Sequence, residues 1–292
     1  MIELFLKYLK FEKRFSDHTI KSYKIDLFQF EKFLLKQYKI HKIESSDHKT
    51  IRSWIINLSS NDFTSTTINR KIASLKSFFK YLISREKINK NPSKKIPSLK
   101  KERRLPKFIK ENDMKLIFDK SKFENNELDM RDLLILELLY GTGIRLSELI
   151  NLKLRDYDKT KSQIKVLGKR NKERIIPLNK NVELQIIKYL NLRKKQNNSF
   201  SEFLITTSKL KKSYPMMIYR IVKENLSKVI NSEQYNPHML RHTFATHLIN
   251  KGADINAVKD LLGHSSLAST QIYTQNSIEK LKKTFQDSHP KA

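Results

Sequence analysis

The chain has 292 residues and a formal charge of +29, from 59 Lys and Arg against 30 Asp and Glu. With 38% hydrophobic residues it can bury cores of its own, so it is no disordered tail, and its length suits two ordinary domains. The absence of cysteine excludes disulfides, zinc–cysteine clusters and thiol nucleophiles.

The first hundred residues predict a small all-helical unit. Apolar residues recur in steps of three and four from Ile20 to Leu34 and from Ile68 to Leu82, as on one face of a helix. Shorter apolar groups at residues 4–9 and 51–58 predict two more helices. We therefore assign residues 1–90 to a four-helix domain.

A charged segment separates this domain from the rest of the chain. Residues 91–106, NPSKKIPSLKKERRLP, hold three of the seven prolines and show no apolar periodicity. Such a composition is typical of an interdomain linker. The linker places the second domain at residues 107–292.

The second domain is predicted to be mostly helical, with a buried helix around residues 133–140. Residues 163–178, QIKVLGKRNKERIIPL, differ because two β-branched segments flank a charged turn that contains a glycine. This pattern predicts an antiparallel hairpin or small sheet. The fold class expected is therefore mainly α, with one small β element.

The basic excess extends over both predicted domains. Two basic domains suit a protein that encloses a polyanion such as nucleic acid, although a general enrichment in lysine would give the same composition. Arg70, Lys71, Lys76 and Lys80 flank the apolar stripe of one predicted helix, either against DNA or in solvent. The start of the chain is too charged for a signal peptide, and no apolar run is long enough to span a membrane, so we expect a cytoplasmic protein.

The stretch NPHMLRHTFATHL places histidines and an arginine on one helix. His238 and His242 have the four-residue spacing of a zinc protease motif, but Met239 stands where that motif needs a glutamate base. Arg241 would repel a metal cation and would attract a phosphate. The residues therefore favour an anionic ligand over a metal.

Other segments supply the remaining side chains for phosphoryl transfer without a metal. In GTGIRLSEL, Glu148 lies one helical turn after Arg145 and can orient its guanidinium, although a surface ion pair has the same spacing. VLGKRNKERIIPL carries Lys169 at the predicted hairpin turn, and LLGHSSLASTQIYTQ carries His264 and Tyr273. A tyrosine can attack phosphorus, arginines can neutralise the phosphate oxygens, and histidine or lysine can move protons.

These four motifs together resemble the tyrosine recombinase (phage integrase) family, and within it the bacterial XerC/XerD recombinases. The resemblance covers essentially the whole chain. SDHTIKSYKIDLFQF and TTINRKIASLKSFFKYL are similar to the four-helix, SAM-like core-binding domain of that family, and RLPKFIKENDMKLIF is similar to the start of its catalytic domain. This implies a DNA-binding core-binding domain at 1–90 and a catalytic domain at 107–292.

The resemblance implies a catalytic set of Arg145, Lys169, His238, Arg241, His264 and Tyr273. The two arginines would clamp the scissile phosphate, and His264 would bind it as well. Lys169 would act as the general acid toward the 5′ oxygen, His238 as a general acid or base, and Tyr273 as the nucleophile. The other two histidines of the arginine helix match positions that are mostly structural.

The same resemblance implies a reaction and its partners. A clamp of two domains would enclose double-stranded DNA at a dif-like site and cut one strand through a 3′-phosphotyrosine, with no cofactor, metal or ATP. Four recombinase protomers would pair two sites to resolve chromosome dimers during cell division, in contact with the FtsK translocase. The tail from Ser277 to Ala292 would dock on a neighbouring protomer.

Two alternatives stay open at the level of sequence. A mobile-element integrase would use the same chemistry on other sites. A non-catalytic DNA-binding relative would keep the fold, but the complete set of six residue types argues against it.

Overall fold

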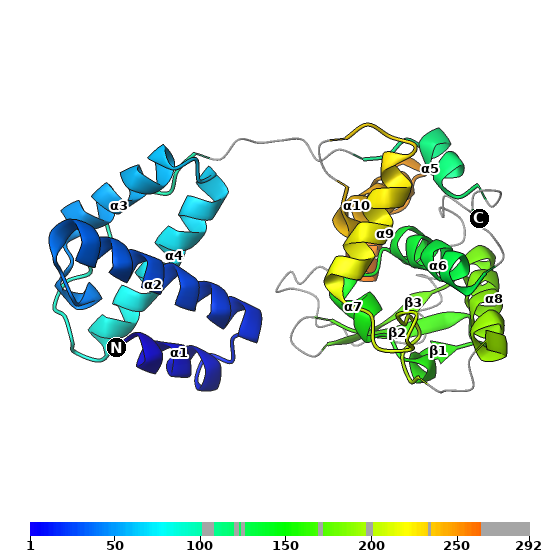
Figure 1. The fold of residues 1–292 in the computed structure, drawn as a ribbon, viewed down its shortest axis with the longest axis horizontal. Coiled ribbons are helices and arrows are strands. Elements are labelled where there is room, and N and C mark those ends of the chain that lie inside the picture. The colour runs from blue at the N-terminus through cyan, green and yellow to red at the C-terminus, as the bar shows by residue number, and fades with distance from the viewer. Residues whose placement is uncertain are drawn as a thin grey trace. The chain divides into compact units, whose positions relative to one another are not determined.

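The structure is a computed structural model of the chain. It describes residues 1–100, 108–119, 123, 126–168, 172–196, 201–232 and 235–263. The chain divides into two compact units, Met1–Arg104 and Leu105–Ala292 (Figure 1). Helices dominate both units, and the second also holds a small antiparallel sheet, so the predicted mainly α fold class is confirmed.

The first unit consists of the four helices that the sequence predicted. They are α1 (Ile2–Phe11), α2 (Asp17–Tyr38), α3 (His48–Ser60) and α4 (Ser65–Ser84), with a short 3₁₀ turn η1 (Ile43–Ser45) before α3. Each of the last three helices begins where the side chain of Ser16, Asp47 or Thr64 accepts a hydrogen bond from a backbone N–H of the first turn. Local capping therefore fixes where these helices start.

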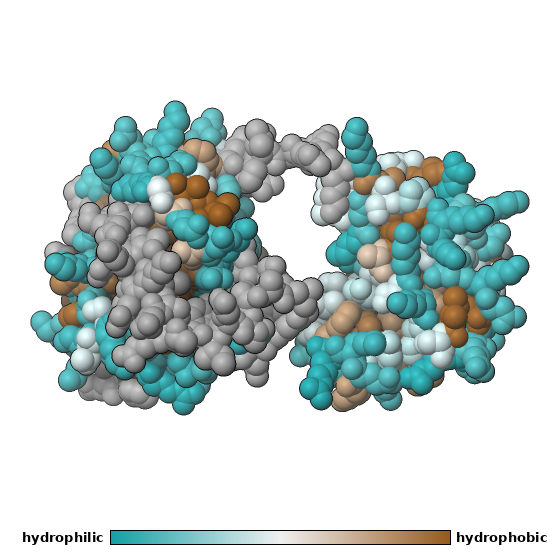
Figure 2. All heavy atoms as spheres, turned by 180° about the vertical axis from the view of Figure 1, so that it is seen from behind, coloured by the Kyte–Doolittle hydropathy of each residue, from teal (hydrophilic) through white to brown (hydrophobic). Residues whose placement is uncertain are grey.

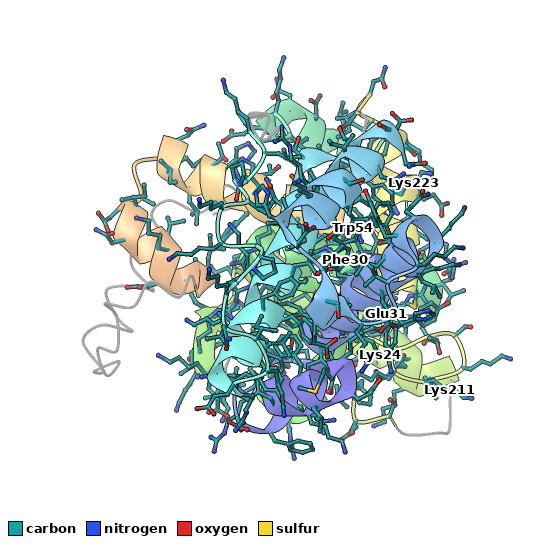
Figure 3. The ribbon with its side chains drawn as sticks, turned by 90° about the vertical axis from the view of Figure 1, so that its left-hand side faces the viewer. Lys24, Phe30, Glu31, Trp54, Lys211 and Lys223 are labelled. Atoms are coloured by element: carbon teal, nitrogen blue, oxygen red, sulfur yellow. The ribbon has the colours of Figure 1, made fainter. Side chains whose placement is uncertain are left out.

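Aromatic side chains fill the centre of this unit. Phe30 of α2 and Trp54 of α3 are buried, with ring centroids 4.8 Å apart (Figure 3). Phe5 of α1 meets Phe78 of α4 edge to face at 5.3 Å. The four helices thus share one core, and Trp54, the single tryptophan of the chain, reports on it.

A buried ion network joins α2 to α4. Asp26 of α2 is fully buried and accepts hydrogen bonds from Lys71 Nζ at 2.9 Å, from Ser74 Oγ at 2.8 Å and from the guanidinium of Arg70. Lys71 is only 3% exposed, so it lies neither in solvent nor on a surface open to DNA, the two positions that the sequence allowed. A buried lysine needs such a counter-charge.

The first unit extends past residue 90, where the sequence placed the start of the linker. Ile96 is buried in the first core, and its carbonyl accepts a hydrogen bond from Lys76 Nζ at 2.7 Å. Asn69 forms two hydrogen bonds with the backbone of Leu99, at 2.9 and 2.7 Å. The segment 91–100 lacks helical periodicity because it packs against α4 through turns and isolated apolar residues.

The second unit is built around α6. Its described helices are α5 (Glu111–Ile117), α6 (Glu127–Thr142), α7 (Leu146–Asn151), the 3₁₀ turn η3 (Leu154–Asp156), α8 (Lys180–Gln196), α9 (Pro215–Ser227), α10 (Pro237–Asn250) and α11 (Ile255–Leu262). Helix α6 is buried nearly all round and packs against α8 and α10. The apolar run at 133–140 predicted this buried helix.

The predicted hairpin is present and is extended by a third strand. Strands β2 (Gln163–Leu167) and β3 (Glu173–Pro177) pair antiparallel with Ile164 opposite Ile176, and β1 (Tyr157–Asp158) pairs with β2. Buried and exposed residues alternate along β2, which presents Ile164 and Val166 to the core. Strand β1 is too short to give a periodic signal in the sequence.

The surface of the described residues is predominantly hydrophilic on the face that Figure 2 draws. Apolar side chains appear there as small separate patches. In the described part of the chain, no helix combines the length and the apolar character needed to cross a membrane.

The Asp26 network should be a principal source of stability in the first unit. Asp26→Ala leaves the ammonium of Lys71 buried without a counter-charge, and we expect a loss of roughly 3–5 kcal/mol in the free energy of unfolding. Urea unfolding followed by the fluorescence of Trp54 measures this unit alone.

The matched control is Glu3→Ala. It removes one partner of the Glu3–Lys24 ion pair, whose side chains are 63% and 52% exposed, and should cost less than about 1 kcal/mol. Equal losses in the two variants would contradict a stabilising role for the Asp26 network.

Candidate active site

Arg145 stands at a tight turn between α6 and α7. Helix α6 ends at Thr142, and Gly143 follows in the left-handed conformation with φ of +59°. A Cβ at position 143 would lie 2.6 Å from Phe244 Cδ1 and 2.7 Å from Leu262 Cδ2, so glycine is required. The turn thereby places Arg145, the N-cap of α7, beside α10 and the end of α11.

Glu148, in the first turn of α7, gathers two arginines. Its carboxylate accepts hydrogen bonds from the backbone N of Arg145 at 2.8 Å and from Arg145 Nη1 at 2.9 Å. It also accepts a bidentate pair from Arg174, with Nη1 at 2.6 Å and Nη2 at 2.8 Å. Glu148 is 4% exposed and Arg174 is 7% exposed, so these two form a buried charge pair. The Arg145–Glu148 pair that the spacing predicted is also more than a surface pair, because its carboxylate is buried.

Arg174 is a member of this cluster that sequence reasoning missed. In the segment VLGKRNKERIIPL the sequence singles out Lys169 at the predicted turn and assigns no role to Arg174. The two-residue period of a strand offered a signal, because Arg174 and Ile176 of β3 share the inward face. An arginine at an inward strand position requires a buried anionic partner.

Arg241 of α10 also contacts the turn between α6 and α7 and the end of α11. Helix α10 begins at Pro237, and the side chain of Asn236 caps it by accepting a bond from Met239 N at 3.0 Å. Arg241 lies on its buried face, where its guanidinium donates to the carbonyls of Gly143 and Leu262. The motif helix therefore contributes Arg241 to the cluster directly.

Three successive carbonyls at the end of α11 each accept a hydrogen bond from a different arginine. Arg174 Nε donates to Leu261 O at 3.0 Å, Arg241 Nη2 donates to Leu262 O at 2.6 Å, and Arg145 Nη2 donates to Gly263 O at 2.6 Å. The carbonyl end of a helix carries partial negative charge, which favours cations there. We call these three arginines together with Glu148 the arginine cluster.

The cluster holds more positive than negative charge. Burial and then the charges of Arg145 and Arg174 lower the pKa of Arg241 to about 10, while Glu148 acts in the opposite direction. Burial raises the pKa of Glu148, but its bonds with Arg174 and Arg145 outweigh this effect and hold it below its usual value. With a pKa of about 10 Arg241 stays charged at neutral pH, and an anion that approached the cluster would be bound favourably.

Of the other four predicted catalytic residues, the structure describes only His238. His238 is exposed on the first turn of α10, three residues before Arg241. Lys169, His264 and Tyr273 lie outside the described residues. The catalytic set as a whole therefore stays a prediction, of which the structure brings together the two arginines.

The residues that precede two of these positions lie at the cluster. A Cβ on Gly168 would lie 3.6 Å from Glu148 Oε1, and Gly263 accepts the hydrogen bond from Arg145. Gly168 and Gly263, which precede Lys169 and His264 in sequence, thus lie beside the carboxylate of Glu148 and the guanidinium of Arg145.

The two remaining histidines of α10 are His242 and His247. His247 is 2% exposed, and its Nδ1 forms a 2.9 Å hydrogen bond with the hydroxyl of Tyr140. Burial lowers its pKa, so it is neutral at physiological pH. His242 is half-buried. Among the residues that the structure describes, no group of three or more His, Cys, Asp and Glu is placed to hold a metal ion.

Comparison with known proteins now identifies the chain. Residues 107–280 match the phage integrase family, and residues 2–86 match the phage integrase N-terminal SAM-like domain. The chain belongs to the phage integrase family. A tyrosine recombinase XerC from Staphylococcus epidermidis is 38% identical to it over 290 residues, which are 99% of this chain and 97% of the relative.

Two solved structures share the fold of this integrase-family chain. The XerH site-specific recombinase bound to a palindromic difH substrate superposes with a TM-score of 0.72 at 21% identity, over 90% of this chain and 78% of that one. The Tn1549 transposon integrase in complex with transposon right end DNA superposes with a TM-score of 0.74 at 20% identity, over 98% and 99%. The predicted family and enzyme class are thereby confirmed: the chain is a tyrosine recombinase, a site-specific DNA recombinase.

Replacing Glu148 should destabilise the second unit in a pH-dependent way. Glu148→Gln leaves Arg174 buried without its counter-charge and should cost roughly 3–5 kcal/mol near pH 7. The folded-state pKa of Glu148 lies below its ordinary 4.5, so the stability it contributes is present above that value and is lost as pH falls through the folded pKa. The gap between wild type and variant should therefore narrow below about pH 4.5.

Hydrogen exchange of the slowest α6 amides measures this gap, because their opening reports unfolding of the whole unit. Glu173→Gln is the control, since Glu173 and its partner Lys165 are 57% and 54% exposed. A gap for Glu148→Gln that is as small as the control's, or that does not change with pH, would show that the buried pair contributes no net stability.

Proposed function

We propose that this recombinase acts as a Xer-type enzyme that resolves chromosome dimers at dif-like sites during cell division and chromosome segregation. The observation that carries the proposal is the 38% identity to XerC over 99% of the chain, which includes both domains and all six expected catalytic residue types. The arginine cluster supports the chemistry, because Arg145 and Arg174 bind one carboxylate and Arg241 donates to the carbonyl next to the one that Arg145 binds, so positive charge is in excess there.

In the proposed reaction, Arg145 and Arg241 bind the non-bridging oxygens of the scissile phosphate. Within the described part of the chain, two of the five N–H donors of each guanidinium are used, and the remaining donors are the ones that we assign to the phosphate. Developing charge on a pentacoordinate phosphorus is then offset by groups already held in place, and no reorganisation is needed during the reaction.

The proposed cleavage step is a substitution at the scissile phosphorus. The phenolic oxygen of Tyr273 forms a bond to phosphorus as the bond to the 5′ oxygen breaks, which gives a 3′-phosphotyrosine and a free 5′ hydroxyl. Lys169 protonates the leaving 5′ oxygen, and His264 binds the phosphate. His238 acts as a general acid or base and is the candidate to accept the proton that the phenol of Tyr273 loses. The phosphotyrosine keeps the energy of the diester, so a 5′ hydroxyl of the partner duplex can attack it without ATP.

The proposed partners follow from the same role. Double-stranded DNA is the substrate, and the charge of +29 supplies a salt-dependent, sequence-independent part of its binding. Four protomers, identical or paralogous, pair two sites and exchange strands through a Holliday junction. The tail from Ser277 to Ala292, which lies outside the described residues, is proposed to dock on a neighbouring protomer, and the FtsK translocase is a further proposed partner. A cytoplasmic location is part of the proposal.

A mobile-element integrase is the second candidate. The Tn1549 transposon integrase shares the fold at a TM-score of 0.74, similar to the 0.72 of XerH, and both are near 20% identity, so the fold does not separate the two roles. The identity to XerC favours the Xer role. The two differ in target: the Xer proposal requires that the sequence bound in cells lies at the replication terminus, and binding at the ends of a mobile element would replace it.

Cleavage can be tested with a nicked suicide duplex that carries a dif-like site. We expect wild type to form a denaturant-resistant protein–DNA adduct and Tyr273→Phe to form none, because the variant lacks the nucleophilic oxygen. Tyr38→Phe is the matched control, since Tyr38 is exposed at the end of α2, and it should form adduct at the wild-type rate. An adduct with Tyr273→Phe, or none with wild type, would refute the proposed chemistry.

A further inference from the structure

We propose that Arg174 is a positioning residue for DNA cleavage, which holds Glu148 and the end of α11 in the arrangement that Arg145 needs to bind phosphate. This inference rests on the proposed function, since it assigns Arg145 to the scissile phosphate. Arg174 itself lies beneath the site. It is 7% exposed, whereas the side chain of Arg145 is 27% exposed, so Arg145 is the one accessible to DNA.

The contacts of Glu148 show why Arg145 depends on Arg174. Oε1 of Glu148 accepts from Nη1 of both arginines, at 2.9 Å from Arg145 and 2.6 Å from Arg174. Oε2 accepts from the backbone N of Arg145 and from Arg174 Nη2, both at 2.8 Å. The planar fork of Arg174 fixes the plane of the carboxylate, and the carboxylate in turn fixes the guanidinium of Arg145.

Arg174 also supports the turn at the end of α11. Its Nε donates to Leu261 O at 3.0 Å, so one guanidinium binds both Glu148 and this helix end. A Cβ on Gly263 would lie 3.1 Å from Arg174 Cδ, which shows that the turn rests directly on the arginine side chain. Gly263 in turn accepts from Arg145 and is followed in sequence by His264.

Lysine cannot replace this arrangement. An ammonium group is a compact point charge on a flexible stem, so it cannot make two parallel bonds to a carboxylate and a third bond to a carbonyl in one plane. Arg174→Lys keeps the charge and removes the fork. Arg174→Gln removes the charge and keeps an amide donor, and it serves as a second variant if the lysine variant is poorly folded.

The chain offers a matched control in Arg193. It is 8% exposed in the same unit, on α8, and its guanidinium donates to the carbonyls of Ser201, Phe203 and Leu204. All three acceptors are backbone carbonyls, and none belongs to the arginine cluster. Arg193→Lys therefore reproduces the loss of a buried guanidinium fork without disturbing Glu148.

The test uses the full-length protein and the nicked suicide duplex. We would measure three quantities for wild type and each variant: the folded fraction by hydrogen exchange, the Kd for the duplex by fluorescence anisotropy, and the single-turnover rate of adduct formation at saturating protein. For Arg174→Lys we expect an adduct rate lower by about 100-fold, after correction for the folded fraction, with a Kd within about threefold of wild type. Arg193→Lys should keep the wild-type rate.

The outcomes separate this inference from the proposed function. A wild type that forms no adduct would overturn both. A wild type that forms adduct, together with an Arg174 variant whose corrected rate matches that of Arg193→Lys, would overturn the positioning role alone. A loss that appears entirely in Kd would also overturn it, because a buried residue that acts through Arg145 should affect the bond-making step.

Discussion

The buried carboxylate of Glu148 is the interaction on which the second unit's site depends. It accepts four hydrogen bonds from Arg145 and Arg174, and these bonds join the first turn of α7 to β3. Since an arginine buried without a counter-charge is strongly unfavourable, the carboxylate allows guanidinium groups to be held where water is scarce. Arg241 joins them through backbone carbonyls instead, so the assembly draws on a turn, a strand and two helices.

This arrangement explains why the site suits a phosphate. Three guanidinium groups lie near one carboxylate, which two of them bind, and all three donate to the partially negative end of α11, so positive charge remains in excess. Burial, and after it the charges of Arg145 and Arg174, lowers the pKa of Arg241, and an anion between the arginines would act against the effect of those charges. In the proposed reaction these groups are fixed before DNA arrives and so can stabilise charge that develops during cleavage.

The sequence predicted those parts of the fold in which local pattern and tertiary packing agree. The four helices of the first unit have clear apolar stripes, three of them begin at a capping residue, and the hairpin has β-branched strands around a turn. Arg145 and Glu148 could be paired because residues three apart on a helix are neighbours. The sequence did not predict the packing of residues 91–100 against the first core or the short strand β1, since neither segment has a period of its own.

Local sequence patterns did not predict contacts between segments that are distant in the chain. Arg174 lies 26 residues from Glu148 in sequence, and Lys71 lies 45 from Asp26. From local sequence alone, neither Arg174 nor Lys71 could be told from a residue on the surface, and only the fold shows their buried partners Glu148 and Asp26. Burial of a charge is set by long-range packing, which a local pattern does not record.

The central claim is that the arginines of the cluster act on the charge of the scissile phosphate. The direct measurement compares wild type with Arg241→Ala on two suicide duplexes, one normal and one with a methyl group in place of a non-bridging oxygen of that phosphate. Arg241→Ala should lower the single-turnover adduct rate strongly on the normal duplex and much less on the uncharged one, because less charge on the phosphate then needs to be offset. An equal loss on both duplexes would contradict it.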